Sequence, residues 1–218
     1  METTTEIILN QTIAFVKQTL RDAEAGHDWF HIERVYKTAL SINQKENGDL
    51  LTVSMAALLH DIADSKFNQG DEEAGPLKAA LFMRSAGLPE ELISHVRKII
   101  RNMSYSTSLG TVTFRSLEMD IVQDADRLDA IGAIGIARAF TYGGFKNRVM
   151  YDPEIQPLAL QDKAHYKQSS APTINHFYEK LLLLKDLMNT AEGKKMAGRR
   201  HAFMEQFLQE FYSEWEGR

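Results

Sequence analysis

The chain contains the stretch AALLHDIADSK at residues 56–66, in which two ionisable residues interrupt the end of an apolar run. Apolar residues precede His60 and Asp61, and Ile62 follows them. A buried imidazole and a buried carboxylate are costly unless they pair with other polar groups or bind a metal ion. If the helix continues, Asp64 lies on the same face as both, at i+4 and i+3. The stretch therefore predicts a buried helix with a polar cluster at its end.

Helical periodicity extends over most of the chain around this stretch. Apolar residues recur at helical spacing over 9–20, 32–42 and 51–62, and only GTVTF at 110–114 resembles a strand. Further helices are expected from Gly75 to about Ala86, from Pro89 onward, from near Leu117 past Ala139, from Thr173 or Asn175 through Met188, and from Lys194 to Trp215. The sequence therefore predicts an all-α fold.

The 218 residues are expected to form one domain, 1–218, because the chain shows no internal repeat and no linker between two cores. Within it we expect a metal-site core over about 26–140 and C-terminal helices over about 173–215. The segment from about 142 to 172 holds three of the five prolines and is predicted to be a long polar loop.

Composition excludes several classes of protein. The chain has no cysteine, which rules out disulfides, thiolate metal sites and cysteine nucleophiles. Its 25 Lys and Arg against 30 Asp and Glu give a net charge of −5, so nucleic acid is not an expected partner. The N-terminus lacks the basic start of a signal peptide, and no apolar run approaches the length of a membrane helix, about 20 residues. We expect a cytoplasmic protein without a membrane partner.

A second group of ionisable residues lies in HDWFHIERV at 27–35, where His27 and His31 are four residues apart. This spacing stacks two imidazoles on one face of a helix. A zinc peptidase motif requires Glu directly after the first His, and Asp28 stands there instead. A peptidase is therefore disfavoured.

A third group lies in VQDADRLDAIGAIGIAR at 122–138. Asp126 and Asp129 share a helix face, whereas Asp124 points elsewhere and suits an N-terminal cap. The stretch lacks the glycine that a calcium-binding loop needs at its sixth position, so calcium is rejected. The small residues that follow, Gly132 among them, suit close helix packing.

These three motifs, in this order, resemble the HD-domain metal-dependent phosphohydrolase superfamily, and most closely its small bacterial single-domain members. The resemblance spans roughly 26–215 and includes NHFYEKL at 175–181. It implies the metal ligands His31, His60, Asp61 and Asp126. It also implies that Asp64 acts as the catalytic acid or base, or orients the attacking water.

The implied ligands suit one divalent transition-metal ion per chain, with manganese favoured and iron, cobalt, nickel, zinc or magnesium allowed. Relatives with two ions carry extra histidines between the HD pair and the last Asp, and here only His95 lies in that interval. Such an ion activates water and polarises a phosphoryl oxygen. The expected reaction is hydrolysis of a phosphate ester or anhydride bond in a small phosphorylated substrate, with a nucleotide favoured.

Other residues are candidates for substrate binding: His27, Arg34, Lys66, Asp129 and Arg138. Each has a structural alternative, such as a solvated cation or, for Asp129, an ion pair with Arg127. The basic stretch GKKMAGRRH at 193–201 is interpreted as a solvated helix face. Two other functions stay open, a catalytically silent nucleotide or metal sensor and a helical interaction module. A homo-oligomer is compatible with the sequence.

Overall fold

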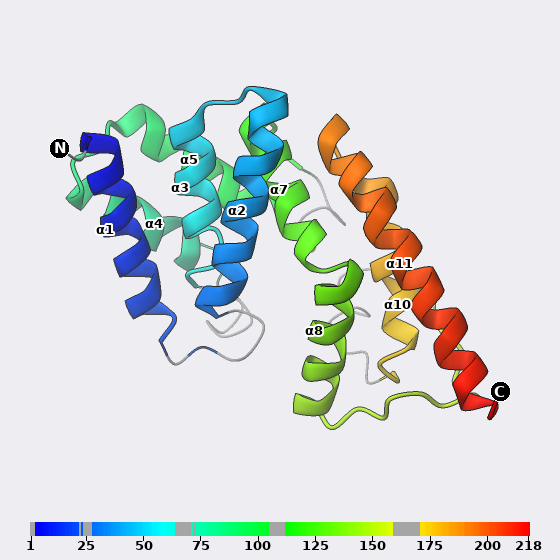
Figure 1. The fold of residues 1–218 in the computed structure, drawn as a ribbon. Coiled ribbons are helices and arrows are strands. Elements are labelled where there is room, and N and C mark those ends of the chain that lie inside the picture. Colours follow the sequence, from blue (N-terminus) through cyan, green and yellow to red (C-terminus); the bar gives the residue numbers. More distant parts are fainter. Residues whose placement is uncertain are drawn as a thin grey trace. The chain divides into compact units, whose positions relative to one another are not determined.

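A computed structural model describes residues 3–21, 23, 28–63, 71, 73–104, 112–158 and 171–218. Every regular element in these ranges is a helix, which confirms the all-α prediction (Figure 1). The elements are α1 (Thr4–Thr19), α2 (Trp29–Glu46), α3 (Leu50–Leu59), α4 (Ala74–Ser85), α5 (Glu90–Asn102), α7 (Leu117–Asp129), α8 (Gly132–Phe145), α10 (Asn175–Glu179), the 3-10 helix η1 (Leu181–Leu187) and α11 (Ala191–Trp215). Among them, no helix has the length and apolar character needed to cross a membrane.

The chain divides into two compact units, Met1–Ala125 and Asp126–Arg218. The boundary falls inside α7, so this one helix contributes to both units. That the two units together make one functional domain stays a prediction.

Helix α3 is the centre of the first unit, where it packs against α1, α2 and α5 (Figure 1). All of its residues from Thr52 to Leu59 are buried. The starts of α2 and α3 are fixed by aspartate caps. Asp28 accepts a hydrogen bond from the backbone N–H of His31, and Asp49 accepts one from that of Thr52. The long apolar run of α3 therefore forms the interior of this unit and ends at the HD dipeptide.

The second unit is built around α11, which packs against α8 and η1. Three aromatic rings pack together in this unit, with the centroid of Phe140 6.0 Å from that of the buried Phe177 and 6.1 Å from that of Phe207. Gly143 lets α8 approach the chain at Thr173, because a Cβ at Gly143 would collide with the Thr173 side chain.

The structure corrects the prediction of one helix from Leu117 past Ala139. Helix α7 ends at Asp129, and α8 begins at Gly132, whose φ of +75° is a left-handed conformation that favours glycine. Asp124 is also not the N-terminal cap of this helix. It lies inside α7 with 0% of its surface exposed.

Other boundaries differ by smaller amounts. Pro89 is the residue before α5 rather than its first helical residue. Helix α8 extends to Phe145, so the loop begins later than 142, and residues 159–170 of that loop lie outside the described part of the chain. The single helix predicted through Met188 is instead the short α10 followed by η1.

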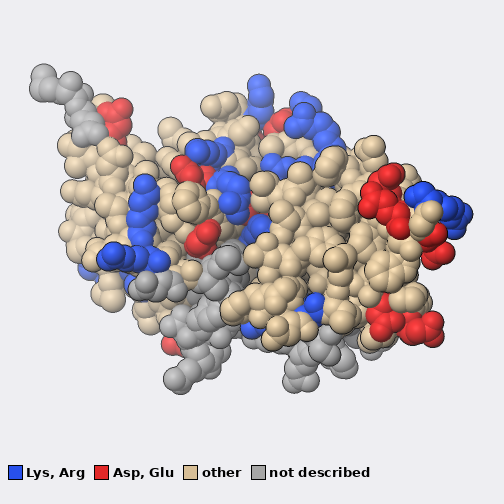
Figure 2. All heavy atoms as spheres, turned by 60° about the horizontal axis from the view of Figure 1, so that its bottom comes forward, with Lys and Arg blue, Asp and Glu red and all other residues tan. Residues whose placement is uncertain are grey.

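Charged side chains of both signs are interspersed on the face shown in Figure 2. The described Lys and Arg residues on this face do not form one continuous basic surface.

Candidate metal centre

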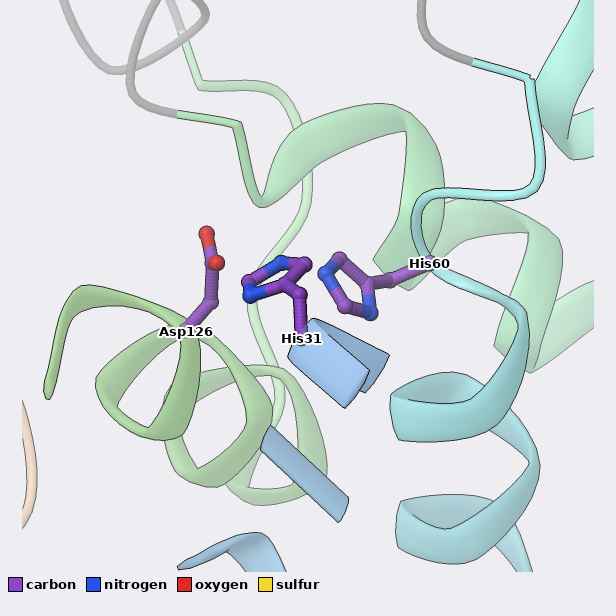
Figure 3. A group of neighbouring side chains, drawn as sticks. All are labelled: His31, His60 and Asp126. Atoms are coloured by element: carbon purple, nitrogen blue, oxygen red, sulfur yellow. The ribbon is translucent and has the colours of Figure 1, made fainter. Parts of the chain in front are cut away.

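His31, His60 and Asp126 form a group that could hold a metal ion, which we call the ligand cluster. Each offers one ligand atom, and these atoms all lie within 4.8 Å of one another. Figure 3 shows the three side chains brought together from α2, from the end of α3 and from α7. Asp126 stands on the helix that both units share.

His31 is held at the first turn of α2. Its backbone N–H donates to Asp28 Oδ1 at 2.9 Å, which fixes the start of the helix, and the residue is 2% exposed. Its ring packs edge-on against that of His60, with centroids 5.3 Å apart and an interplanar angle of 71°. The two imidazole rings therefore lie in contact, with His31 buried and His60 half-buried.

His60 follows the last residue of α3 as its C-terminal cap. The helix ends at Leu59, before the HD dipeptide, and not at Ile62 as the apolar stripe predicted. Nδ1 of His60 lies 2.9 Å from the carbonyl oxygen of Ala57, so the N–H belongs on Nδ1 and donates to that carbonyl. This bond leaves Nε2 as the nitrogen of His60 that could bind a metal ion, and it restrains the plane of the ring.

Asp61 lies beside the ligand cluster. Its Oδ2 is 4.0 Å from Nε2 of His31, and its side chain is 16% exposed. The carboxylate is thus close to one of the three clustered ligands, although the cluster itself contains only His31, His60 and Asp126. The assignment of Asp61 as a fourth ligand stays a prediction.

The donor types in the cluster fit a divalent transition-metal ion. Two imidazoles and one carboxylate are ligands that manganese, iron, cobalt, nickel and zinc accept, and the sequence has no thiolate to select zinc. The cluster also adjoins the buried end of α3, where Leu58 and Leu59 are 0% exposed. Within the cluster itself His31 is buried, whereas His60 and Asp126 are half-buried, so solvent can reach part of it.

The other predicted site residues have varied positions. Arg34 is half-buried on α2, one helical turn after His31. Asp64 and Lys66, together with His27, lie outside the described residues. His95 is engaged within the first unit, with its Nε2 3.0 Å from Ser116 Oγ and 3.6 Å from Glu118 Oε2.

Asp129 and Arg138, both predicted as pocket residues, form an ion pair with each other. Nη1 of Arg138 donates to Oδ2 of Asp129 at 2.7 Å, and Asp129 is 3% exposed. The alternative partner considered from the sequence was Arg127, whose Nη1 donates to the carbonyl of Leu187.

Arg200 was missed by the sequence interpretation, which placed it on a solvated face. In the structure it is half-buried, and its Nη1 donates to the carbonyl oxygen of Leu128 in α7. Burial lowers the pKa of Arg200, and the charge of Asp129 partly offsets that shift. Arg200 packs against Gly132, where a Cβ would lie 3.0 Å from Cβ of Arg200, and this contact leaves no local signal in the sequence.

Known proteins are similar to this chain over nearly its whole length. A family model for the HD domain matches residues 29–131. Bacillus subtilis YpgQ is 37% identical, over 95% of this chain and 93% of YpgQ. Its crystal structure in complex with ADP has a TM-score of 0.75 and covers 97% of each chain. The crystal structure of an HD-superfamily hydrolase from Bacillus thuringiensis is 47% identical, with a TM-score of 0.78 over 99% of this chain and 100% of that one.

Proposed function

Because this chain belongs to the HD superfamily of hydrolases, we propose that it is a metal-dependent phosphohydrolase that cleaves a phosphate ester or anhydride bond of a nucleotide. The observation that carries the proposal is the ligand cluster, in which three ligand atoms lie within 4.8 Å of one another. The complex of YpgQ with ADP supports a nucleotide as the ligand class. Manganese is the proposed ion, and the cytoplasm the proposed compartment.

The residues proposed to hold the ion are His31, His60 and Asp126, with Asp61 as the fourth ligand. When bound, a divalent ion supplies activated water and electrophilic assistance to phosphoryl transfer. The chain contributes the orientation of the ligands. Asp28 fixes the helix start that carries His31, and the carbonyl of Ala57 sets which nitrogen of His60 is available.

The remaining roles rest on the sequence motifs. We propose that Asp64 accepts or delivers the proton during hydrolysis, because it follows the HD pair by three residues. Cationic and polar groups near the motifs, Arg34, Lys66 and His27, are proposed to bind the phosphate groups. Arg34 fits this role by position, since it lies one turn along α2 from His31.

The test is a hydrolysis screen with purified protein. Nucleoside triphosphates and diphosphates, phosphate monoesters and cyclic nucleotides are each incubated with manganese, iron, cobalt, nickel, zinc or magnesium. Release of orthophosphate and pyrophosphate is measured separately, which identifies the bond that breaks. We expect metal-dependent cleavage of a nucleotide that Asp126→Asn abolishes and that Asp186→Asn, at an exposed carboxylate, leaves unchanged.

Two results contradict this function. Nucleotide binding without turnover under any of the six metals supports a silent sensor, the alternative that the sequence leaves open. Hydrolysis that is equally fast in a chelator and in Asp126→Asn shows that the ligand cluster takes no part in the reaction.

A further inference from the structure

The C-terminal end of α7 is held by two arginines from other helices of the second unit. The last carbonyl groups of an α-helix have no partner within the helix and need one from elsewhere. Arg138 of α8 donates from Nη1 to the carbonyl oxygen of Asp129 at 3.2 Å. Arg200 of α11 donates to that of Leu128, which also accepts a hydrogen bond from the backbone N–H of Ile131 at 3.2 Å. The positive charges of the two arginines also interact favourably with the negative C-terminal end of the helix dipole. The end of α7 is therefore tied to both long helices of its unit.

Arg138 makes two hydrogen bonds to Asp129. The same nitrogen lies 2.7 Å from Oδ2 of Asp129, so one guanidinium binds both the side chain and the backbone of that residue. The Asp129 side chain is 4% exposed and that of Arg138 25% exposed. Removing Arg138 takes an ion-pair partner from a buried carboxylate, which costs more than at an exposed ion pair.

The backbone next to these contacts makes room for Arg200. Gly132 follows the break between α7 and α8, and a Cβ there would lie 3.0 Å from both Cβ and Cγ of Arg200. The stem of Arg200 thus packs directly on the glycine. Its neighbour Arg199 is exposed on the same helix, so the contact is specific to one of two adjacent arginines.

These contacts surround the turn of α7 that presents Asp126. Asp126 precedes Leu128 by two residues and Asp129 by three, so all three belong to one helical turn. We propose that Arg138 and Arg200 are positioning residues, which hold this turn so that the Asp126 carboxylate stays in the ligand cluster. The proposal rests on the proposed metal site and gives Arg138 a role other than binding substrate.

The test measures manganese affinity by electron paramagnetic resonance, with metal-free protein titrated with Mn²⁺. We expect Arg138→Gln and Arg200→Gln each to weaken Mn²⁺ binding about 10- to 100-fold, the usual effect of losing a group that orients a ligand. Arg138→Lys keeps the charge but not the planar guanidinium. Its Mn²⁺ affinity should lie between those of the original chain and Arg138→Gln. Arg199→Gln is the matched control and should bind Mn²⁺ like the original chain.

ADP affinity, measured in parallel, separates positioning from substrate binding. Weaker ADP binding with unchanged Mn²⁺ affinity in Arg138→Gln overturns the proposal. Arg138 would then be a substrate-binding residue. If the Gln variants lose their helical circular dichroism, the Mn²⁺ titration is made instead with the folded variants Arg138→Lys and Arg200→Lys. Unchanged Mn²⁺ affinity in both overturns the proposal. Absence of Mn²⁺ binding by the unaltered chain instead contradicts the proposed function itself.

Discussion

The Nδ1 atom of His60 lies 2.9 Å from the carbonyl oxygen of Ala57, one turn back in the helix that His60 terminates. A backbone carbonyl at the end of a helix thus determines which imidazole nitrogen faces Asp126 and His31. Because the helix ends at Leu59, the carbonyl of Ala57 and the ring of His60 belong to the same helix end.

Loss of a ligand should remove the metal. Asp126→Asn and Asp61→Ala are each expected to lower bound metal well below the roughly one ion per chain of the original protein, because each removes a carboxylate from the site. Elemental analysis of dialysed protein measures this. Asp186→Asn serves as the control, and full metal content in Asp61→Ala restricts the site to the three residues of the ligand cluster.

Metal should stabilise the folded chain. The ligands come from residues 31, 60 and 126, which lie close together only after folding. An ion at a hundred times its dissociation constant adds about 2.7 kcal/mol to the free energy of unfolding. We expect the Tm to fall on addition of a chelator and to recover with excess Mn²⁺. If the Tm changes with neither chelator nor Mn²⁺, the result favours the alternative function of a helical interaction module, in which the polar clusters are internal ion pairs.

Acid should release the metal and stop the reaction together. Imidazole nitrogens bind metal only when deprotonated, so protons compete with the ion at His31 and His60. Bound metal and kcat/KM, measured over the same series of pH values, are expected to decline along one curve. Loss of activity with metal fully retained assigns the pH dependence to another group.

Asp64→Asn should separate catalysis from metal binding. Asparagine keeps the shape of the side chain but cannot act as an acid or base, so we expect metal content and substrate binding to persist while kcat falls about 10²- to 10⁴-fold. Single-turnover rates and elemental analysis on one preparation give both quantities. Loss of metal would make Asp64 a ligand, and near-normal turnover would remove it from the mechanism.

Glu118 should make the first unit sensitive to acid. Burial raises the pKa of Glu118, but the hydrogen bond that it accepts from the backbone N–H of Asp49 at 3.1 Å and other contacts lower it overall. A carboxyl with a lowered pKa in the folded state stabilises the fold above its unfolded pKa, and this is lost as the pH falls through the folded value. Its contribution is thus present at pH 7 and declines below the ordinary value of 4.5.

Urea unfolding in the presence of chelator tests this at pH 7 and at pH 3. We expect Glu118→Gln to lower the free energy of unfolding by about 1 kcal/mol at pH 7, with a smaller difference at pH 3. Glu210→Gln, at an exposed carboxylate, provides the baseline. A difference that is the same at both pH values excludes the charge of Glu118 as its cause.

The sequence predicted the parts of the fold that depend on periodic burial. The apolar repeat around Ile32, Val35 and Ala39 is the buried face of α2, and the run before His60 is the interior helix α3. The same motifs predicted His31, His60 and Asp126, which the structure brings together. Periodicity and ordered motifs are local signals, so they could be identified without the tertiary structure.

The end of α7 could not be predicted in this way. Gly132 and Gly135 follow Asp129 among alanines and isoleucines, and the break depends on the left-handed conformation of Gly132, which glycine permits but does not require. Arg200 stands in a basic run typical of a solvated face, and its burial depends on α7 ending beside it. Asp124 was predicted to be a cap because it lies on another helix face than Asp126, and its burial depends on tertiary packing that the sequence does not show.

The break at Gly132 also sets how freely the chain can vary in sequence. A side chain there must adopt a φ of +75°, and its Cβ must lie 3.0 Å from Arg200. A Cβ at Gly144 or Gly198 meets nothing within 4 Å, and both glycines lie inside helices. In a saturation library selected for folding, codon 132 should return almost only glycine, while codons 144 and 198 should drift toward alanine.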